Sequence, residues 1–120
     1  MKEETKKWIN KAKDDLDTAK YNIKGGKIEA GIFFLQQVAE KSLKGTYIEK
    51  ANILLKTHDL ILLARKVNAP KKIFDFCKEL SPAYLYTRYP DIPSEDNLNI
   101  KVNEFVRYAE EILKWVEKNI

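Results

Sequence analysis

The chain has 120 residues, of which 44% are hydrophobic, which is enough for one core built from several packed elements. With 22 Lys and Arg against 18 Asp and Glu, the formal charge of +4 is too small to indicate a nucleic-acid binder by itself. The single cysteine, Cys77, excludes an internal disulfide and a thiolate metal cluster.

Signals for export or membrane insertion are missing from the sequence. No hydrophobic run of secretory length follows the N-terminal lysines, and charges interrupt every long apolar stretch within a few residues. A lone cysteine is also compatible with a reducing compartment. We therefore expect a cytoplasmic protein that has no membrane partner.

Two long helices are predicted in the first part of the chain. From Lys6 to Lys24 the apolar residues recur every three or four positions, and Gly25 and Gly26 then end the helix. The segment from Ile28 to about Ile48 contains no proline and is apolar over a wide arc. A helix that apolar must be covered on more than one side, so it is predicted to be central.

Shorter helices are predicted before a long C-terminal one. Thr57 is expected to cap a helix through Val67, and Pro70 and the Ser81-Pro82 pair each to start another, the last ending near Arg88. Residues 89–99 have a loop composition, and an amphipathic stripe runs from about Ile100 to the C-terminus. No strand alternation is found, so residues 1–120 are predicted to form one all-α domain, an antiparallel four- to five-helix up-and-down bundle.

A polar strip interrupts the apolar surface of the central helix. Its spacing places these side chains on one face: Gln36, Gln37, Glu40, Lys41 and Lys44. On a generic helix such a strip is a solvated face held by exposed pairs. The alternative is the polar wall of a cleft, because a helix this apolar has little surface left for solvent.

The segment 84–91 gathers aromatic rings around an arginine. Its notable residues are Tyr84, Tyr86, Arg88, Tyr89 and Asp91. Tyrosines offer flat faces for stacking, and a guanidinium can fork onto phosphate or carboxylate, so the segment could hold a nucleotide or single-stranded RNA. Equally, the tyrosines could pack the loop against the bundle while Arg88 pairs with Asp91.

Conventional catalytic motifs are not found. His58 is the only histidine, so a two-histidine metal site is excluded, and its place at a predicted helix start also suits capping. The glycines build no phosphate-binding loop, and no nucleophile elbow occurs. The sequence indicates no metal and no cofactor.

Four blocks, in this order, resemble the HEPN domain family. They are Trp8 to Ala19, Phe33 to Lys44 with its QQ-x-A-E-K pattern, Thr57 to Leu60, and Tyr84 to Asp91 with its R-Y-P-D pattern. The resemblance implies a four- or five-helix bundle, usually a homodimer. It also implies a protein often encoded beside a minimal nucleotidyltransferase, which binds nucleotides or acts in a toxin–antitoxin pair.

The chain departs from the ribonuclease members of that family. Their motif is an arginine followed four to six residues later by histidine, and Arg65, Arg88 and Arg107 all lack such a histidine. The general acid or base of metal-independent RNA cleavage then has no evident replacement. A ribonuclease is therefore the weakest of the interpretations.

The leading hypothesis is a binding module for a nucleotide or for a nucleotidyltransferase partner. Its predicted polar cleft is formed by Arg88, Tyr89, Tyr86, Asp91, Gln36, Gln37, Glu40, Lys41 and His58. The rival hypothesis is a structural interaction protein without a ligand. A homodimer is also expected, because Tyr108 and Trp115 lie on a second face of the last helix, and the alternative is that Trp115 lies over the first helix near Trp8.

Overall fold

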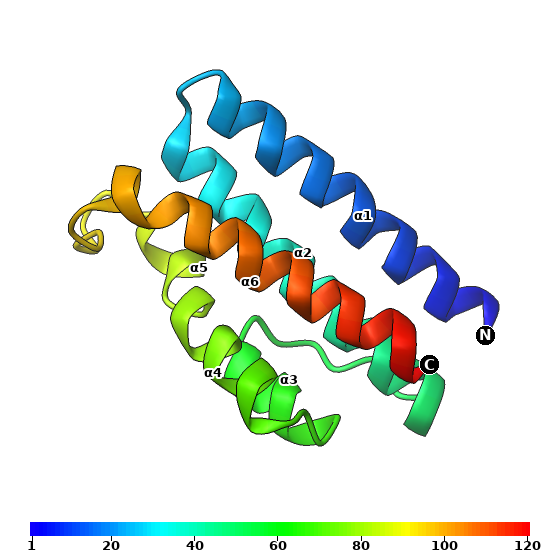
Figure 1. Cartoon of the computed structure of the whole chain (residues 1–120). Coiled ribbons are helices and arrows are strands. Elements are labelled where there is room, and N and C mark those ends of the chain that lie inside the picture. The colour runs from blue at the N-terminus through cyan, green and yellow to red at the C-terminus, as the bar shows by residue number, and fades with distance from the viewer.

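The computed structural model describes residues 1–120 and contains six helices and no strand (Figure 1). In chain order the helices are α1 (Glu3–Lys24), α2 (Ile28–Ala51), α3 (Leu60–Lys66), α4 (Lys71–Leu80), α5 (Ala83–Tyr86) and α6 (Leu98–Asn119). The prediction of an all-α bundle is confirmed. No helix combines the length and the apolarity needed to cross a membrane.

The long helices α1 and α2 form a hairpin whose turn depends on glycine. Gly26 has a φ of 84°, a conformation that L side chains rarely adopt. The two helices then approach closely at Gly31 and Gly45. A Cβ added to Gly45 would lie 3.2 Å from the Cβ of Trp8, so the missing side chain permits this approach.

The prediction that α2 is central is confirmed. It packs against α1 and α6 and also against the short helices α3, α4 and α5. Ion pairs from Lys20 to Glu110 (2.9 Å) and from Lys13 to Glu117 (3.1 Å) show that α1 and α6 run in opposite directions. Helix α6 consequently runs alongside α2 in the same direction (Figure 1).

The return path between α2 and α6 is made by residues 52–59 and the three short helices, not by one long helix. Asp59 is the N-cap of α3, and its carboxylate accepts hydrogen bonds from the backbone N–H groups of Ile61 and Leu62. The prediction of Thr57 as the cap is wrong, because its hydroxyl instead accepts a bond from the Asp59 N–H (3.1 Å). Helix α5 is also shorter than predicted and ends at Tyr86.

The aromatic residues of α6 are covered within this one chain. Tyr108 stacks on Phe76 of α4 with ring centroids 4.6 Å apart, and the Lys50 ammonium lies 5.8 Å from the Trp115 ring. Both aromatic side chains are only partly exposed and pack against the core. These two residues therefore give less reason for a dimer than their spacing suggested, and the homodimer stays a prediction.

Candidate functional site

Three residues of the polar strip are buried. Gln36, Glu40 and Lys44 follow one another at four-residue intervals on α2, and they are 0, 3 and 6% exposed. Residues 52–59 return along this side of α2 and bring His58 over Gln36 and Glu40. The interpretation of the strip as a solvated face is wrong for these three side chains.

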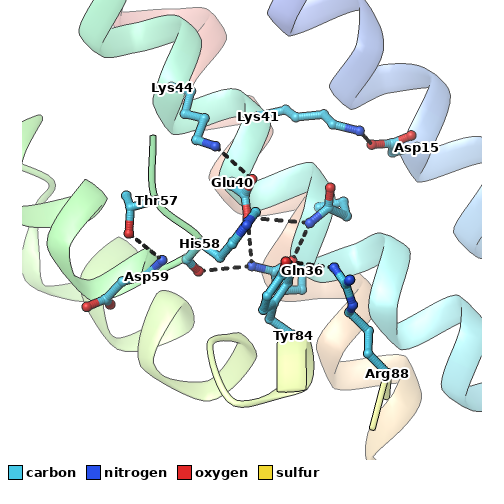
Figure 2. A network of polar contacts seen from close by, with 11 residues as sticks. Asp15, Gln36, Glu40, Lys41, Lys44, Thr57, His58, Asp59, Tyr84 and Arg88 are labelled. Atoms are coloured by element: carbon cyan, nitrogen blue, oxygen red, sulfur yellow. Dashed lines mark hydrogen bonds and ion pairs between the residues drawn. The ribbon is translucent and has the colours of Figure 1, made fainter. Parts of the chain in front are cut away.

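Glu40 is the centre of a polar network (Figure 2). Its Oε2 accepts a hydrogen bond from the Lys44 ammonium (2.9 Å), and its Oε1 lies 3.0 Å from Nδ1 of His58. The same Oε1 accepts weaker bonds from the side-chain amides of Gln36 (3.3 Å) and Gln37 (3.4 Å). A buried carboxylate needs such partners, since an unpaired buried charge is costly.

The two glutamines connect this network to the backbone and to each other. Gln36 Nε2 also donates to the His58 carbonyl (3.3 Å), and Gln37 Nε2 donates to Gln36 Oε1 (2.7 Å). Gln36 thus bonds the backbone of His58 while Glu40 bonds its ring. The orientation of the imidazole is set by α2.

Lys41 is directed away from this network. Its ammonium pairs with Asp15 of α1, and both side chains are largely covered (Figure 2). The predicted strip therefore divides between two sides of α2, and Lys41 does not join His58.

Tyr84 connects His58 to Arg88. The Tyr84 and His58 rings stack with centroids 4.0 Å apart and an interplanar angle of 14°. Nη1 of Arg88 donates to the Tyr84 hydroxyl (2.6 Å), and the guanidinium carbon lies 4.6 Å from the Tyr84 ring. Phe33 of α2 and Tyr89 also face the guanidinium, at 6.0 and 5.6 Å.

Arg88 is exposed and has no acidic partner. The ion pair with Asp91 that the sequence allowed is not formed, and Asp91 is exposed. A guanidinium has several N–H donors, and the protein uses one of them here. Aromatic rings therefore hold the group while most of its donors stay free for an anion.

The placement of Tyr86 in the cleft is wrong. Its side chain is 5% exposed, packs in the hydrophobic core, and has a hydroxyl without a hydrogen-bond partner. Burial raises the pKa of this phenol well above its usual range, with smaller contributions from Glu95 and Glu29. Residues two apart on a helical turn point to different sides, so Tyr84 faces the cluster and Tyr86 the core.

The predicted cleft leaves out several members of this surface. Tyr84 precedes Arg88 by four residues, and this helical spacing is the signal that could have identified it as the partner. Phe33 could have been placed near Gln36 and Gln37 by the same spacing rule. Lys44 belongs to the predicted strip but not to the predicted cleft, and it pairs with Glu40; Asp15, which pairs with Lys41, belongs to neither.

The cluster borders a shallow hollow of about 260 Å³, lined by His58, Asp59, Ser81, Tyr84 and Leu85. A larger hollow of about 670 Å³ lies at the turn between α1 and α2, against residues 94–100. That hollow contains Glu29 and Glu95 but none of the predicted binding residues. The stacked rings of His58 and Tyr84 line the smaller hollow, and the Arg88 guanidinium lies against Tyr84 at its border. This hollow is therefore the better site for an anionic aromatic ligand.

Comparison with known proteins bears on this arrangement. The family model described as the HEPN domain matches residues 5–119. The chain belongs to the HEPN domain family. Among curated proteins no relative matches the chain.

Two crystal structures share this HEPN fold. The structure of TT1696 from Thermus thermophilus is 25% identical over 99% of this chain and 100% of that chain, with a TM-score of 0.88. The structure of ST0689, an archaeal HEPN homologue, is 32% identical over 98% of both chains, with a TM-score of 0.78. Nearly the whole chain therefore takes part in the similarity.

In this HEPN chain an arginine and a histidine share one aromatic partner without the family's ribonuclease spacing. His58 precedes α3 and Arg88 follows α5, and both contact Tyr84. Arg65 instead lies over Phe74, and Arg107 lies over Phe76 and Tyr108. Arg88 is thus the arginine that contacts the same tyrosine as His58.

Proposed function

We propose that this HEPN protein is a nucleotide-binding module that works with a nucleotidyltransferase partner, as one half of a toxin–antitoxin pair. The observation that carries the proposal is the state of Arg88. Its guanidinium is held between aromatic rings, donates one hydrogen bond to Tyr84, and has no carboxylate partner.

Phosphate is the group that Arg88 suits best. A guanidinium binds phosphate through paired N–H donors, and the charge-assisted bonds are stronger than neutral ones. Because no ion pair has to be broken first, the phosphate competes only with water. The Tyr84 hydroxyl fixes one end of the guanidinium, which reduces the ordering cost of binding.

A nucleobase can stack beside this phosphate site. One face of the His58 ring is covered by Tyr84, and about half of the His58 side chain is exposed. Tyr89 is 43% exposed and its ring lies 5.6 Å from the Arg88 guanidinium carbon. Aromatic faces bind bases with little dependence on their identity, so the proposal does not require one particular nucleotide.

Calorimetric titration with ATP, GTP, CTP and UTP tests the nucleotide part of the proposal. We expect Arg88→Ala to weaken the affinity by at least about tenfold, because charge-assisted hydrogen bonds are lost. Arg107→Ala is the matched control, since Arg107 also lies over two aromatic rings but on α6, and it should change the affinity by less than about twofold. No heat with any nucleotide, or equal losses in both variants, would refute the site.

The partner part of the proposal is supported by family membership. Co-purification of the chain with the nucleotidyltransferase encoded nearest to it is the direct test. We expect a complex that wild-type protein forms and that a charge reversal at the exposed site, Arg88→Glu, weakens. If the wild-type proteins do not associate, the proposed nucleotidyltransferase partner is refuted, whereas the proposed nucleotide site is unaffected.

A purely structural role is the alternative, and one observation favours it. The network of Gln36, Glu40 and His58 ties residues 52–59 to α2, which is a structural function in itself. In that case Arg88→Ala lowers the melting temperature without changing any binding. Parallel thermal melts and titrations of this one variant separate the two functions.

A further inference from the structure

The hollow at Tyr84 adjoins two others along the molecule. His58 also lines a hollow of about 260 Å³ with Trp8, Lys44 and residues 54–57. Trp8 in turn lines a third hollow of about 280 Å³ with Glu4, Lys7, Lys11 and Lys41. Neighbouring hollows share a lining residue, so the three lie in a row from α5 past residues 54–58 to α1. We call this row of hollows the Trp8 groove.

The indole of Trp8 is a partly buried platform in this groove. Its Cβ lies against α2 at Gly45, where the absence of a side chain allows the helices to approach. The Lys44 ammonium lies 5.6 Å from the ring centroid. Such an arrangement leaves part of the ring in contact with the two hollows.

Positive charge in the groove is only partly neutralised. Lys7 pairs with Glu4 (3.5 Å), Lys41 with Asp15 and Lys44 with Glu40 (2.9 Å). The remaining two lysines, Lys11 and Lys56, form no ion pair and are exposed. Lys56 lines the same hollow as the two aromatic platforms, Trp8 and His58.

We propose that the Trp8 groove binds a ligand with two nucleobases joined by phosphates. This inference rests on the proposed nucleotide site, and it adds a second base-stacking position at Trp8 and a phosphate contact at Lys56. Each hollow alone is smaller than the roughly 300 Å³ at which small-molecule pockets begin, whereas two adjoining hollows suit a dinucleotide. Stacking on an indole with a lysine beside it matches the way bases and phosphates are held in other proteins.

Tryptophan fluorescence tests the second position directly. The chain has two tryptophans, so Trp115→Phe leaves Trp8 as the sole reporter without changing the groove. ATP, diadenosine tetraphosphate and 5′-phosphorylated adenylyl-adenosine serve as ligands. ATP and diadenosine tetraphosphate share an adenine and a phosphate chain. A difference between their affinities therefore reports the contribution of the second base.

We expect at least one of the two-base ligands to quench Trp8 and to bind at least about tenfold tighter than ATP, the gain typical of one stacked base. A preference for the tetraphosphate indicates a free dinucleoside polyphosphate, and a preference for adenylyl-adenosine indicates the end of an oligonucleotide. In calorimetry with Trp115 restored, Trp8→Leu should remove the two-base advantage and leave ATP affinity within about twofold.

Lys56→Gln is the second variant, because an exposed lysine can be replaced without affecting folding. It should weaken the two-base ligands by at least about threefold, whereas Lys114→Gln, on α6 away from the groove, should not. If ATP binds and neither two-base ligand binds tighter, the inference fails and the proposed function stands. If ATP itself does not bind, the proposed function fails and this inference falls with it.

Discussion

Glu40 is the residue on which the site depends most. It is buried, bonds the ammonium of Lys44, and holds the ring of His58. Glu40→Gln would leave the Lys44 ammonium buried without its counter-charge. We expect the free energy of unfolding to fall by about 3 kcal/mol, the usual cost of breaking a buried ion pair, as measured by urea denaturation.

Asp75→Asn is the matched control for this prediction. Asp75 and Lys71 also form a lysine–carboxylate pair four residues apart on one helix, but that pair is exposed. Its loss should cost less than about 0.5 kcal/mol. If both variants lost a similar amount of unfolding free energy, burial of Glu40 and Lys44 would not add to the cost of breaking their ion pair.

Cys77 predicts a dependence of stability on pH. Burial raises the pKa of its thiol to about 12, so the folded protein keeps a proton that the unfolded chain loses above about pH 8.5. Ionisation of the unfolded state then favours unfolding, and stability falls as pH rises from there towards 12. The loss attributable to this group is at most about 1.4 kcal/mol per pH unit.

Urea denaturation at about pH 7.5 and pH 9.5 checks this dependence on alkaline pH. Cys77→Ala is expected to be less stable at both values because it leaves a small cavity, but to lose less stability between them than wild type. An identical loss in the two proteins would show that the thiol does not titrate differently on unfolding.

At the level of single residues, the sequence predicted which residues form the polar strip, but not which neighbouring element each side chain contacts. Helical spacing placed Gln36, Gln37, Glu40 and Lys41 on one face. Gln36 and Glu40 do contact His58, and Gln37 joins them through hydrogen bonds to both. Lys41 departs because its partner, Asp15, lies on another helix. The choice of Asp15 as the partner of Lys41 depends on a contact between residues far apart in sequence. A rule based on helical spacing does not include such contacts.

The contact between α1 and α2 depends on Gly31. A Cβ at this position would lie 2.4 Å from Cγ1 of Ile23 and 3.1 Å from the Ala19 carbonyl oxygen, which belongs to the rigid backbone of α1. Gly31→Ala should therefore destabilise the protein by about 1 to 3 kcal/mol, although alanine favours helix formation. Thermal or urea unfolding measures the change.

A double-mutant cycle identifies the cause of that loss. Ile23→Ala removes the Cγ1 atom that the new methyl group would meet. The double variant should then cost at least about 1 kcal/mol less than the sum of the two single variants. Strict additivity would mean that the close approach at Gly31 does not limit the packing.

The long helices were predictable from sequence, but the short ones were not placed accurately. Periodic apolar stripes gave α1, α2 and α6 to within a few residues at each end. Helix α5 is a single turn, so a small error in its predicted end changes which tyrosine faces outward. The predicted cleft therefore includes Tyr86, whereas in the structure Tyr84 stacks on His58. The N-cap of α3 shows the same kind of error, because it is Asp59 and not the predicted Thr57, two residues earlier.

For the whole molecule, the homodimer is the main prediction still to be tested. Isologous contact is the commonest way for a small helical protein to cover exposed apolar residues, and Tyr21, Leu62 and Ile100 are such residues outside the nucleotide site. Sedimentation at micromolar concentration should give about twice the 14.0 kDa of one chain. A single-chain mass that does not change on concentration would exclude the dimer.

The location of the second chain can be tested with Trp115→Lys. Trp115 was expected at the dimer contact, but in the structure it packs partly against its own core beneath Lys50. If Trp115 is in the contact, this variant sediments as a monomer with an unchanged helical spectrum. A dimer that survives the substitution would place the contact elsewhere.

At this scale the all-α class followed from composition and periodicity, whereas the site did not. The site exists because residues 52–59 cross back over α2 and bring His58 to Glu40, while α5 brings Tyr84 and Arg88 to the same place. No local pattern encodes that path. The family resemblance predicted the order of the motifs along the chain, but only the structure shows which residues of these motifs contact one another.

The central claim is that a nucleotide binds at the surface formed by His58, Tyr84 and Arg88. Nitrogen–proton NMR spectra recorded during titration with ATP test it most directly, because the side-chain amides of Gln36 and Gln37 and the Nε of Arg88 report on the site individually. We predict saturable shifts at these groups and at the backbone of His58 and Tyr84. A spectrum that does not change, or shifts confined to the face of α4 and α6 around Phe76 and Trp115, would contradict the claim.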